Sequence, residues 1–280
     1  MAKILIVGCG AIGLQFAELL AQQGHSITGL KRTPPESAHR LINFMTADLR
    51  VPAQLQTLDD DFEHIFFILS ADERSEAAYR EIYESGLNHL IAQFEGASIK
   101  PIWWMVSSTS VYGQTQGEWV DEDSPAEPTE ITGQLIRQAE QTLTQLDPRN
   151  CVVRFSGIYG PGREYLLRQA RQIPAIQQSP PYYTNRIHAQ DCVGVLDFLL
   201  AKRLAGEALA QCYLASDDDP APLWEVMNWL AEHMQLAPPS VKTNLARIDS
   251  NKRCRNQRLK QLGYQFLYPN YKLGYGELIE

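Results

Sequence analysis

The stretch GCGAIG near the start of the chain constrains the fold more than any other feature of the sequence. It follows a four-residue apolar run, Ile4–Val7, which is short enough for a fully buried parallel strand. It opens a segment, Ala11–Gln23, whose apolar residues recur at helical spacing. Glycines 8, 10 and 13 between a strand and a helix are typical of a turn that binds a dinucleotide.

Each glycine of this turn has a separate physical reason. Gly8 permits the tight turn, Gly10 lets the backbone approach a pyrophosphate, and Gly13 lets the helix pack closely on the strand. Free N–H groups at the N-terminus of the helix then face the anion, so we expect Ala11 and Ile12 to join the three glycines in cofactor binding. The alternative, a tight turn without a ligand, stays open.

The end of the second expected strand, Ser26–Leu30, predicts which cofactor is bound. NAD enzymes place an acidic residue there to bind the ribose 2′-hydroxyl. This chain has Lys31 and Arg32 instead, and two cations suit a 2′-phosphate, so NADP(H) is favoured over NAD(H). The alternative is that both are solvated loop charges. Asp48 and Leu49 follow the third strand, where they can meet the adenine, although Asp48 fits a helix N-cap equally well.

Apolar runs and amphipathic segments continue to alternate along the chain, which predicts an α/β protein with a doubly wound, parallel, Rossmann-type sheet. Further strands are expected at Leu41–Thr46, Ile65–Leu69, Ile102–Val106 and Cys151–Phe155, with helices at Ser75–Phe94, weakened by Gly86, and Ile131–Leu146. The segment from Ser107 to Glu130 is expected to be a polar loop.

After Phe155, Gly and Pro residues divide the chain into shorter pieces. We expect helices at Gln190–Lys202, Leu223–His233 and Arg255–Leu262, and a strand at Gln211–Ala215. The sequence therefore predicts a dinucleotide-binding domain of residues 1–155 plus 189–203. A smaller C-terminal α+β substrate lobe is expected to comprise residues 156–188 plus 204–280.

Composition excludes several other classes of function. The chain has 25 Lys+Arg against 33 Asp+Glu, a net charge of −8, which argues against nucleic-acid binding. No apolar run is long enough to span a membrane. Five cysteines without a CxxC pair indicate neither a disulfide framework nor a metal site. A cytoplasmic monomer or homodimer is expected. The basic cluster Lys252–Arg258 is interpreted as a solvated helix face.

An ordered set of motifs resembles a known family. The motifs are SSTSVYG (107–113), RFSGIYGPGR (154–163), RIHAQD (186–191), YLASDD (213–218) and KRCRNQRLKQLGYQFLYP (252–269). Together with the glycine turn, they resemble the extended short-chain dehydrogenase/reductases of the NAD-dependent epimerase/dehydratase family, in their atypical, YeeZ-like branch. The resemblance covers nearly the whole chain.

The resemblance implies a Ser or Thr, a Tyr and a Lys as catalytic groups. The Ser role falls on Ser108, with Thr109 beside it. Ser107, Ser70 and Ala71 fall where the family's cofactor passes. The Tyr exchanges a proton with the substrate, and the Lys lowers the pKa of the Tyr.

The expected Tyr-xxx-Lys pair is missing from this chain. With Glu140 aligned to the family's Glu eight residues after the Tyr, the Tyr position holds Thr132 and the Lys position holds Ile136. The resemblance therefore leaves Ser108, Thr109 and Thr132 as catalytic candidates. Positioned acid–base catalysis is worth about 10²–10⁴-fold, so the usual mechanism cannot be assumed.

Candidate substrate-binding residues come from the later motifs: Tyr112, Arg154, Tyr159, Arg163, Arg186 and His188. For the two arginines at 154 and 163, an inter-domain salt bridge is the alternative to binding a phosphate or carboxylate. For Tyr159 and His188, the alternative is packing in a core.

Two functions follow from these observations. The first is an NADP(H)-dependent oxidoreductase or epimerase/dehydratase that acts on a nucleotide sugar or a similar polar substrate. The second is a non-catalytic NADP(H)-binding sensor or regulator, which the missing Tyr and Lys suggest. Whether the chain is an enzyme stays open at this stage.

Overall fold

The computed structural model describes residues 1–33, 40–243 and 250–279, which form two compact units. Each unit takes several separate stretches of the chain. The first unit comprises Met1–Ser108, Glu130–Val153 and Leu196–Cys212, and the second comprises Thr109–Thr129, Arg154–Val195 and Tyr213–Glu280. The domain boundaries drawn from the sequence stay a prediction.

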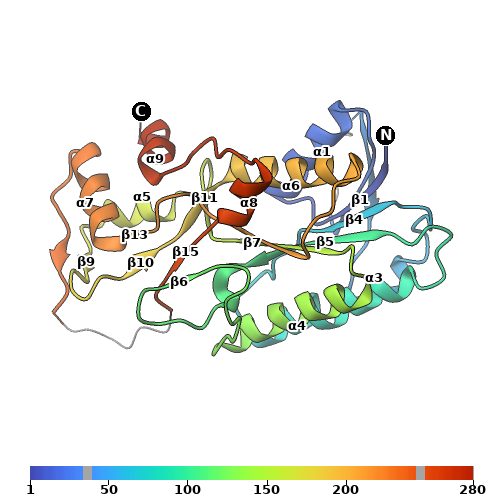
Figure 1. The fold of residues 1–280 in the computed structure, drawn as a ribbon, viewed down its shortest axis with the longest axis horizontal. Helices are drawn as coiled ribbons and strands as arrows, with labels where there is room; N and C mark the ends of the chain where they lie inside the picture. The colour runs from blue at the N-terminus through green and yellow to red at the C-terminus, as the bar shows by residue number, and fades with distance from the viewer. Residues whose placement is uncertain (34–39, 244–249, 280) are drawn as a thin grey trace. The chain divides into compact units, whose positions relative to one another are not determined.

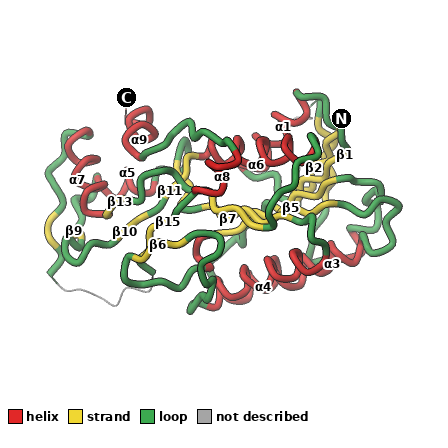
Figure 2. The backbone as a smooth tube through the Cα atoms, in the orientation of Figure 1, coloured by secondary structure: helices red, strands yellow, loops and turns green. Residues whose placement is uncertain are grey.

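The main sheet has seven strands in the order β12-β7-β5-β4-β1-β2-β3 (Figures 1 and 2). Its strands are β1 (Lys3–Val7), β2 (Ser26–Lys31), β3 (Ile42–Thr46), β4 (His64–Phe67), β5 (Ile102–Ser108), β7 (Cys151–Phe155) and β12 (Cys212–Ala215). The four neighbouring pairs from β3 to β5 are parallel. The α/β, Rossmann-type fold predicted from the sequence is confirmed.

Buried apolar strands explain why this sheet is parallel and covered on both faces. Every residue of β4 and β7 is buried, and so are four of the five residues of β1. Helix α1 (Ala11–Gln22) lies on one face, and α3 (Leu87–Gln93) and α4 (Ile131–Leu146) lie on the other, as Figure 1 shows. The core includes Phe66, which packs edge-on against Phe16 and stacks on Trp104.

The order in which the chain forms these strands creates a switch point in the sheet. From β1 the chain moves outward to β2 and β3, and then returns to β4 on the other side of β1. The strand order therefore reverses at the carboxyl end of β1, where open α/β sheets bind their ligands. The glycine turn lies at this point because it directly follows β1.

The helix expected at residues 75–94 contains a local irregularity. It consists of α2 (Glu76–Tyr79), a π-helical turn η2 (Arg80–Gly86) and α3. A Cβ at Gly86 would lie 2.8 Å from the Glu81 carbonyl oxygen and 3.1 Å from the Leu49 Cβ. The glycine that weakens the helical pattern is thus the one that lets the widened turn approach Leu49.

The described residues of the second unit form four small two-stranded sheets. They are β8 (Gly157–Tyr159) with β11 (Arg186–His188), β9 (Ala175–Ile176) with β14 (Ser240–Val241), β6 (Glu118–Val120) with β15 (Lys252–Cys254), and β10 (Tyr183–Thr184) with β13 (Ala221–Pro222). The helices are α5 (Tyr165–Ala170), α7 (Leu223–His233), α8 (Gln257–Leu262) and α9 (Tyr271–Ile279), and α6 (Ala189–Leu204) passes from this unit into the first. An apolar cluster that includes Leu167, Val226, Leu230 and Tyr275 forms its core.

The structure corrects the sequence analysis in this second unit. The predicted polar loop at 107–130 contains η3 (Thr109–Val111) and strand β6, which pairs in parallel with β15 more than 130 residues later. A three-residue strand with a distant partner has no periodicity that a sequence window can detect. Helices α5 and α9 were not predicted. No helix in the described ranges has the length and apolar character needed to cross a membrane.

We predict that His64 makes the free energy of unfolding depend on pH. His64 is buried in β4, where its Nδ1 accepts a hydrogen bond from Trp104 Nε1 at 3.2 Å, and burial lowers its pKa from 6.5 to about 4. Between these values the unfolded chain binds a proton that the folded chain does not bind. Stability should therefore fall by about 3 kcal/mol as pH drops from 6.5 to 4.

The measurement is urea unfolding as a function of pH. His64→Asn, which keeps an acceptor for Trp104, should show a flatter slope than the wild type. His233→Asn, at an exposed position on α7, should keep the wild-type slope. An unchanged slope in His64→Asn would show that other groups carry the dependence.

Candidate functional site

The glycine turn is held by main-chain contacts that leave no room for side chains. Gly8 has φ +104°, and a Cβ there would lie 2.6 Å from the Ile68 carbonyl oxygen. A Cβ at Gly13 would lie 2.1 Å from the Gly8 carbonyl oxygen. Both positions therefore require glycine, because the end of β1 is in contact with α1 on one side and with the end of β4 on the other.

Gly10 differs from its two neighbours in the motif. A Cβ at Gly10 would meet no atom within 4 Å. Gly10 is the N-cap residue of α1, and no side chain caps the helix or places a carboxylate in its first turn. The first N–H groups of α1 are thus available to an anion that approaches over Gly10.

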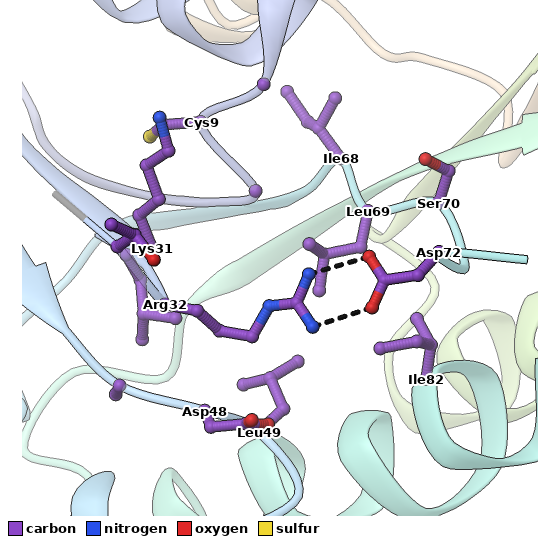
Figure 3. A pocket seen from close by; sticks show the side chains of 15 residues that line it. Cys9, Lys31, Arg32, Asp48, Leu49, Ile68, Leu69, Ser70, Asp72 and Ile82 are labelled. Atoms are coloured by element: carbon purple, nitrogen blue, oxygen red, sulfur yellow. Dashed lines mark hydrogen bonds and ion pairs between the residues drawn. The ribbon is translucent and has the colours of Figure 1, made fainter. Parts of the chain in front are cut away.

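A cavity of about 280 Å³ opens beside this turn (Figure 3). It is lined by the turn, by the ends of β2, β3 and β4 with the residues that follow them, and by one residue of η2: Gly8, Cys9, Gly10, Leu30, Lys31, Arg32, Thr33, Ala47, Asp48, Leu49, Ile68, Leu69, Ser70, Asp72 and Ile82. Seven of the predicted cofactor-binding residues line it. Ala11, Ile12 and Gly13 continue from it into α1, and Ala71 follows Ser70 in the chain.

Lys31 and Arg32, the two cations expected to bind a 2′-phosphate, have different contacts in this cavity. The Lys31 side chain has no hydrogen-bond or ion-pair partner among the residues that the structure describes, and Figure 3 shows it extending towards Cys9. Arg32 forms a bidentate pair with Asp72, with both N–O distances 2.6 Å. This exposed pair keeps the guanidinium at the cavity (Figure 3), and Asp72 is a residue that the sequence analysis missed.

Asp48 adopts a turn in place of the helix N-cap considered from the sequence. Its carboxylate accepts hydrogen bonds from the backbone N–H of Arg50 at 2.9 Å and from the Arg50 guanidinium. These bonds hold the pKa of Asp48 below its usual value. The short 3₁₀ helix that follows, η1 (Pro52–Gln54), has Val51 as its N-cap, so the N-cap interpretation was wrong.

Cys9 is a small, buried side chain in the turn, and its thiol donates to the Ile6 carbonyl oxygen at 3.6 Å. Its side chain is buried under Gly29, and burial raises its pKa to about 11. A thiol that stays protonated at neutral pH is a poor nucleophile. In the described parts of the chain, no group of three His, Cys, Asp or Glu side chains is placed to hold a metal ion.

Ser107 is tied to helix α4 by a buried hydrogen bond. Its hydroxyl donates to Glu140 Oε1 at 2.6 Å, and Arg137 donates to Glu140 Oε2 at 2.8 Å. Glu140, the residue aligned to the family's Glu, is thereby fixed beneath the end of β5. This arrangement fixes the end of β5, whose last residue is Ser108.

On the α4 face that should carry the catalytic pair, the Lys position is apolar. Thr132, Ile136 and Glu140 follow one another at four-residue spacing, and Ile136 is buried with 4% of its surface exposed. Thr132 is half-buried in the first turn of α4. Ser108 is half-buried at the end of β5, and Thr109 is buried at the start of η3 in the second unit.

Tyr112 and Arg154 form a buried pair. The Tyr112 hydroxyl donates to the Asp121 carbonyl oxygen at 2.7 Å and accepts from Arg154 at 2.8 Å. The guanidinium also lies 5.0 Å from the centre of the Tyr112 ring. Both side chains thus hold the segment after β5 in place.

Tyr159 and His188 pack in an aromatic cluster of the second unit. The His188 ring lies 5.2 Å from Tyr159 and 3.8 Å from Tyr268, measured between ring centres. A Cβ at Gly274 would lie 2.0 Å from the Tyr159 hydroxyl oxygen. Burial raises the pKa of Tyr159 and lowers that of His188, so both rings are neutral at physiological pH.

The two remaining arginine candidates, Arg186 and Arg163, differ in solvent exposure. Arg186 is buried, donates to the carbonyl oxygen of Thr184 at 3.3 Å and also contacts its hydroxyl, and lies 5.1 Å from the centre of the Tyr271 ring. Arg163 is exposed in the turn after β8. Of the two, only Arg163 presents its guanidinium to solvent.

The basic cluster at 252–258 corrects the sequence analysis. Lys252 is buried in β15 with 5% of its surface exposed. Arg253 and Arg255 lie over the Trp119 ring, and Arg258 pairs with Asp123. The interpretation as a solvated helix face was wrong because the cluster begins in a strand whose partner, β6, was not predicted.

The sheet order and the glycine turn together define a Rossmann-type dinucleotide-binding fold. The model of the NAD dependent epimerase/dehydratase family matches residues 4–208, which is most of the chain. The chain therefore belongs to this family.

Similar proteins match the chain over nearly its full length. Protein YeeZ of Escherichia coli (strain K12) is 26% identical over 287 residues, covering 96% of this chain and 97% of YeeZ. A structure from Methylobacillus flagellatus, described as a candidate NAD-dependent epimerase/dehydratase, is 35% identical with a TM-score of 0.83, covering 99% of this chain and 97% of its own. MoeE5 in complex with UDP-glucose and NAD shares the fold, with 20% identity, a TM-score of 0.78 and coverage of 99% and 97%.

We predict that substitution of Gly13 impairs folding, whereas substitution of Gly10 impairs cofactor binding. Gly13→Ala should lower the free energy of unfolding by about 3 kcal/mol, because its Cβ would overlap the Gly8 carbonyl. Gly10→Ala should change it by less than about 1 kcal/mol, because its Cβ meets nothing. Urea unfolding measures both.

The same Gly10→Ala protein should bind NADPH at least about tenfold more weakly in titration calorimetry, because the methyl group would occupy the space over the helix N-terminus. Wild-type affinity in Gly10→Ala would show that the ligand does not approach over this residue.

Proposed function

We propose that the chain is an NADP(H)-dependent oxidoreductase or epimerase/dehydratase-like protein that acts on a nucleotide sugar or a similar polar hydroxyl or carbonyl substrate. The observation that carries the proposal is the cavity beside the glycine turn. There an uncapped helix N-terminus and two cations lie at the point where the strand order reverses. Membership of an NAD dependent family supports the same conclusion.

The residues of the cavity fit a dinucleotide with a 2′-phosphate. The main-chain amides that follow Gly8 and Gly10 suit a pyrophosphate. Lys31 and Arg32, at the end of β2, suit the phosphate on the adenosine ribose. Neither residue is acidic, so neither would accept a hydrogen bond from the 2′-hydroxyl of NAD. Asp72 holds the Arg32 guanidinium with its plane fixed, although its negative charge offsets part of the attraction for a phosphate.

The chemistry proposed for this site is hydride transfer to or from the substrate. The cofactor, when bound, would supply the nicotinamide for this transfer. Ser108, and Thr109 beside it, are proposed to hydrogen-bond the substrate oxygen at which the hydroxyl and carbonyl forms interconvert. Thr132 can donate a hydrogen bond but cannot act as an acid or base near neutral pH. Ile136 gives no positive charge to the cofactor ribose.

Without the usual Tyr and Lys on α4, turnover is expected to be slow. Loss of a positioned acid–base group typically costs about 10²–10⁴-fold in rate. The protein is thus expected either to turn over slowly or to receive its proton from a residue outside α4.

A second function is favoured by one specific observation. Ile136 fills the Lys position with a buried apolar side chain, which packs the α4 face as a core. Such a face suits a protein that binds NADP(H) and reports its redox state without reacting. Turnover measurements decide between these two functions.

The substrate class and assembly are further parts of the proposal. MoeE5 was solved with UDP-glucose and NAD, which supports a nucleotide sugar as the substrate of this chain. Arg163, exposed on the turn after β8, and the buried Arg154, Arg186, Tyr112, Tyr159 and His188 are proposed to shape the substrate lobe. A monomer or homodimer in the cytoplasm is proposed.

We predict that NADPH binds at least about tenfold more tightly than NADH, or about 1.4 kcal/mol, because only NADPH carries the phosphate that Lys31 and Arg32 attract. Titration calorimetry measures both affinities. Lys31→Ala should reduce the ratio, whereas Lys100→Ala, an exposed lysine paired with Asp147, should not. Equal affinities in the wild type would remove the NADP(H) assignment.

We also predict that Ser108→Ala lowers turnover and leaves cofactor affinity intact, because the hydroxyl contacts substrate and not the dinucleotide. The measurement is NADPH oxidation with a panel of keto sugars or nucleotide sugars, alongside calorimetry. Loss of NADPH binding in Ser108→Ala would assign the residue a structural role instead.

A further inference from the structure

A second cavity, of about 170 Å³, lies wholly within the second unit. Its lining is dominated by hydroxyl and amide groups and contains a single lysine: Thr109, Tyr182, Tyr183, Thr184, Asn185, Ser250 and Lys252. At roughly 30 Å³ per water, the cavity has room for about five waters, and so for a small organic acid or a phosphate group.

Lys252 is a buried cation with only neutral partners. Its Nζ donates to the Ser250 hydroxyl at 2.6 Å and to the Tyr112 carbonyl oxygen at 3.3 Å. Across the described residues, no carboxylate pairs with it. An ammonium group has three N–H donors, so one donor remains after these two bonds.

The charged and titratable groups around Lys252 do not compensate its charge. Glu118 is opposite in the register of β6, but it is exposed and accepts from the backbone N–H of Gln116. Arg253 faces the Trp119 and Tyr183 rings. Burial lowers the pKa of Lys252, and among the described residues Cys254 is the one group with an opposing effect. Burying an unpaired cation is costly, and an anion bound in the cavity would remove that cost.

The walls of the cavity are fixed before any ligand binds. Asn185 donates to the Lys252 carbonyl oxygen at 2.9 Å and accepts from the Cys254 N–H at 2.7 Å. Asn251 accepts from the Tyr183 N–H at 2.8 Å and donates to the Pro181 carbonyl oxygen at 3.0 Å. Two buried or half-buried amides thus join the 181–185 segment to the main chain at 251–254, which fixes the backbone that carries Lys252.

We propose that Lys252 is the anion-binding residue of this cavity and holds a carboxylate or phosphoryl oxygen of a small, hydroxyl-bearing ligand. Thr109, Tyr182 and Tyr183 line the same cavity and carry hydroxyl groups that suit the ligand's hydroxyls. Thr109, which lines the cavity, belongs to the SSTSVYG motif and follows Ser108 directly in the chain. That the anion belongs to the substrate rests on the proposed function, but its binding to Lys252 does not.

Lys252 does not replace the lysine that α4 lacks. In the family pattern the lysine comes from the helix where this chain has Ile136, whereas Lys252 comes from a strand more than a hundred residues later. Lys252 binds the ligand's charge in this proposal and is not assigned a proton-transfer step.

The test is a titration of the whole protein with inorganic phosphate and, separately, with acetate, followed by backbone amide NMR. Binding at the proposed site should shift the amide signals of Thr184 and Asn185 saturably. The two probes distinguish a phosphoryl from a carboxylate ligand, and a shift with either supports the site. Phosphate bound at the glycine turn would instead shift Gly8 and Gly10, so the two sites are resolved.

Two variants complete the experiment. Lys252→Met should remove the saturable shifts, or weaken binding at least about tenfold, while NADPH affinity is retained. Lys242→Met, at an exposed lysine of the same unit, should bind as the wild type does. Lys252→Met should also unfold no more easily than the wild type, because it removes an unpaired buried cation.

The wild-type protein gives an independent readout in case Lys252→Met does not fold. The affinity for the anion should fall as pH rises through the lowered pKa of Lys252, because the neutral amine loses its attraction for the ligand. Absence of shifts at Thr184 and Asn185 with both probes, or binding that persists in Lys252→Met, would overturn the proposal. Failure of NADPH binding would overturn the proposed function and leave this test unaffected.

Discussion

The contact between the main chain of Gly8 and its neighbours is the constraint on which the rest of the structure depends. Gly8 adopts a left-handed conformation against the Ile68 carbonyl, and Gly13 brings α1 onto the Gly8 carbonyl. These two approaches join β1, α1 and the end of β4 without any intervening side chain. They also leave the N-terminus of α1 open over Gly10, so the requirement for close packing and the ability to accept an anion have one origin.

Charge is distributed unequally between the two cavities. Beside the glycine turn, the Arg32 guanidinium is held by Asp72 in the open, where water screens the pair. In the second unit, Lys252 is buried with only neutral acceptors, so its charge is neither screened nor paired within the described chain. The first arrangement orients a cation at modest energetic cost, and the second keeps a cation in a state that a bound anion would stabilise.

Helix α4 shows how a family fold can persist while its usual catalytic pair is absent. The Ser107 hydroxyl donates to Glu140 beneath the end of β5, and this bond holds the strand end in place. Ile136 is buried at the position where the lysine would stand. The framework that positions Ser108 therefore depends on packing and on one buried hydrogen bond, and not on the Tyr and Lys.

The sequence by itself determined the sheet, because buried parallel strands are apolar runs and their helices carry a regular apolar face; α4 and β7 have the predicted bounds. It also placed the glycine turn, since steric demands on glycine are local. Only the tertiary structure decided what β6 and β15 do, because strands of three residues are defined by a distant partner. The same distant pairing buries Lys252, gives it Ser250 and the Tyr112 carbonyl as partners, and changes an ordinary surface charge into a candidate binding group. Burial and pairing are properties of the assembled chain, and no local pattern of residues encodes them.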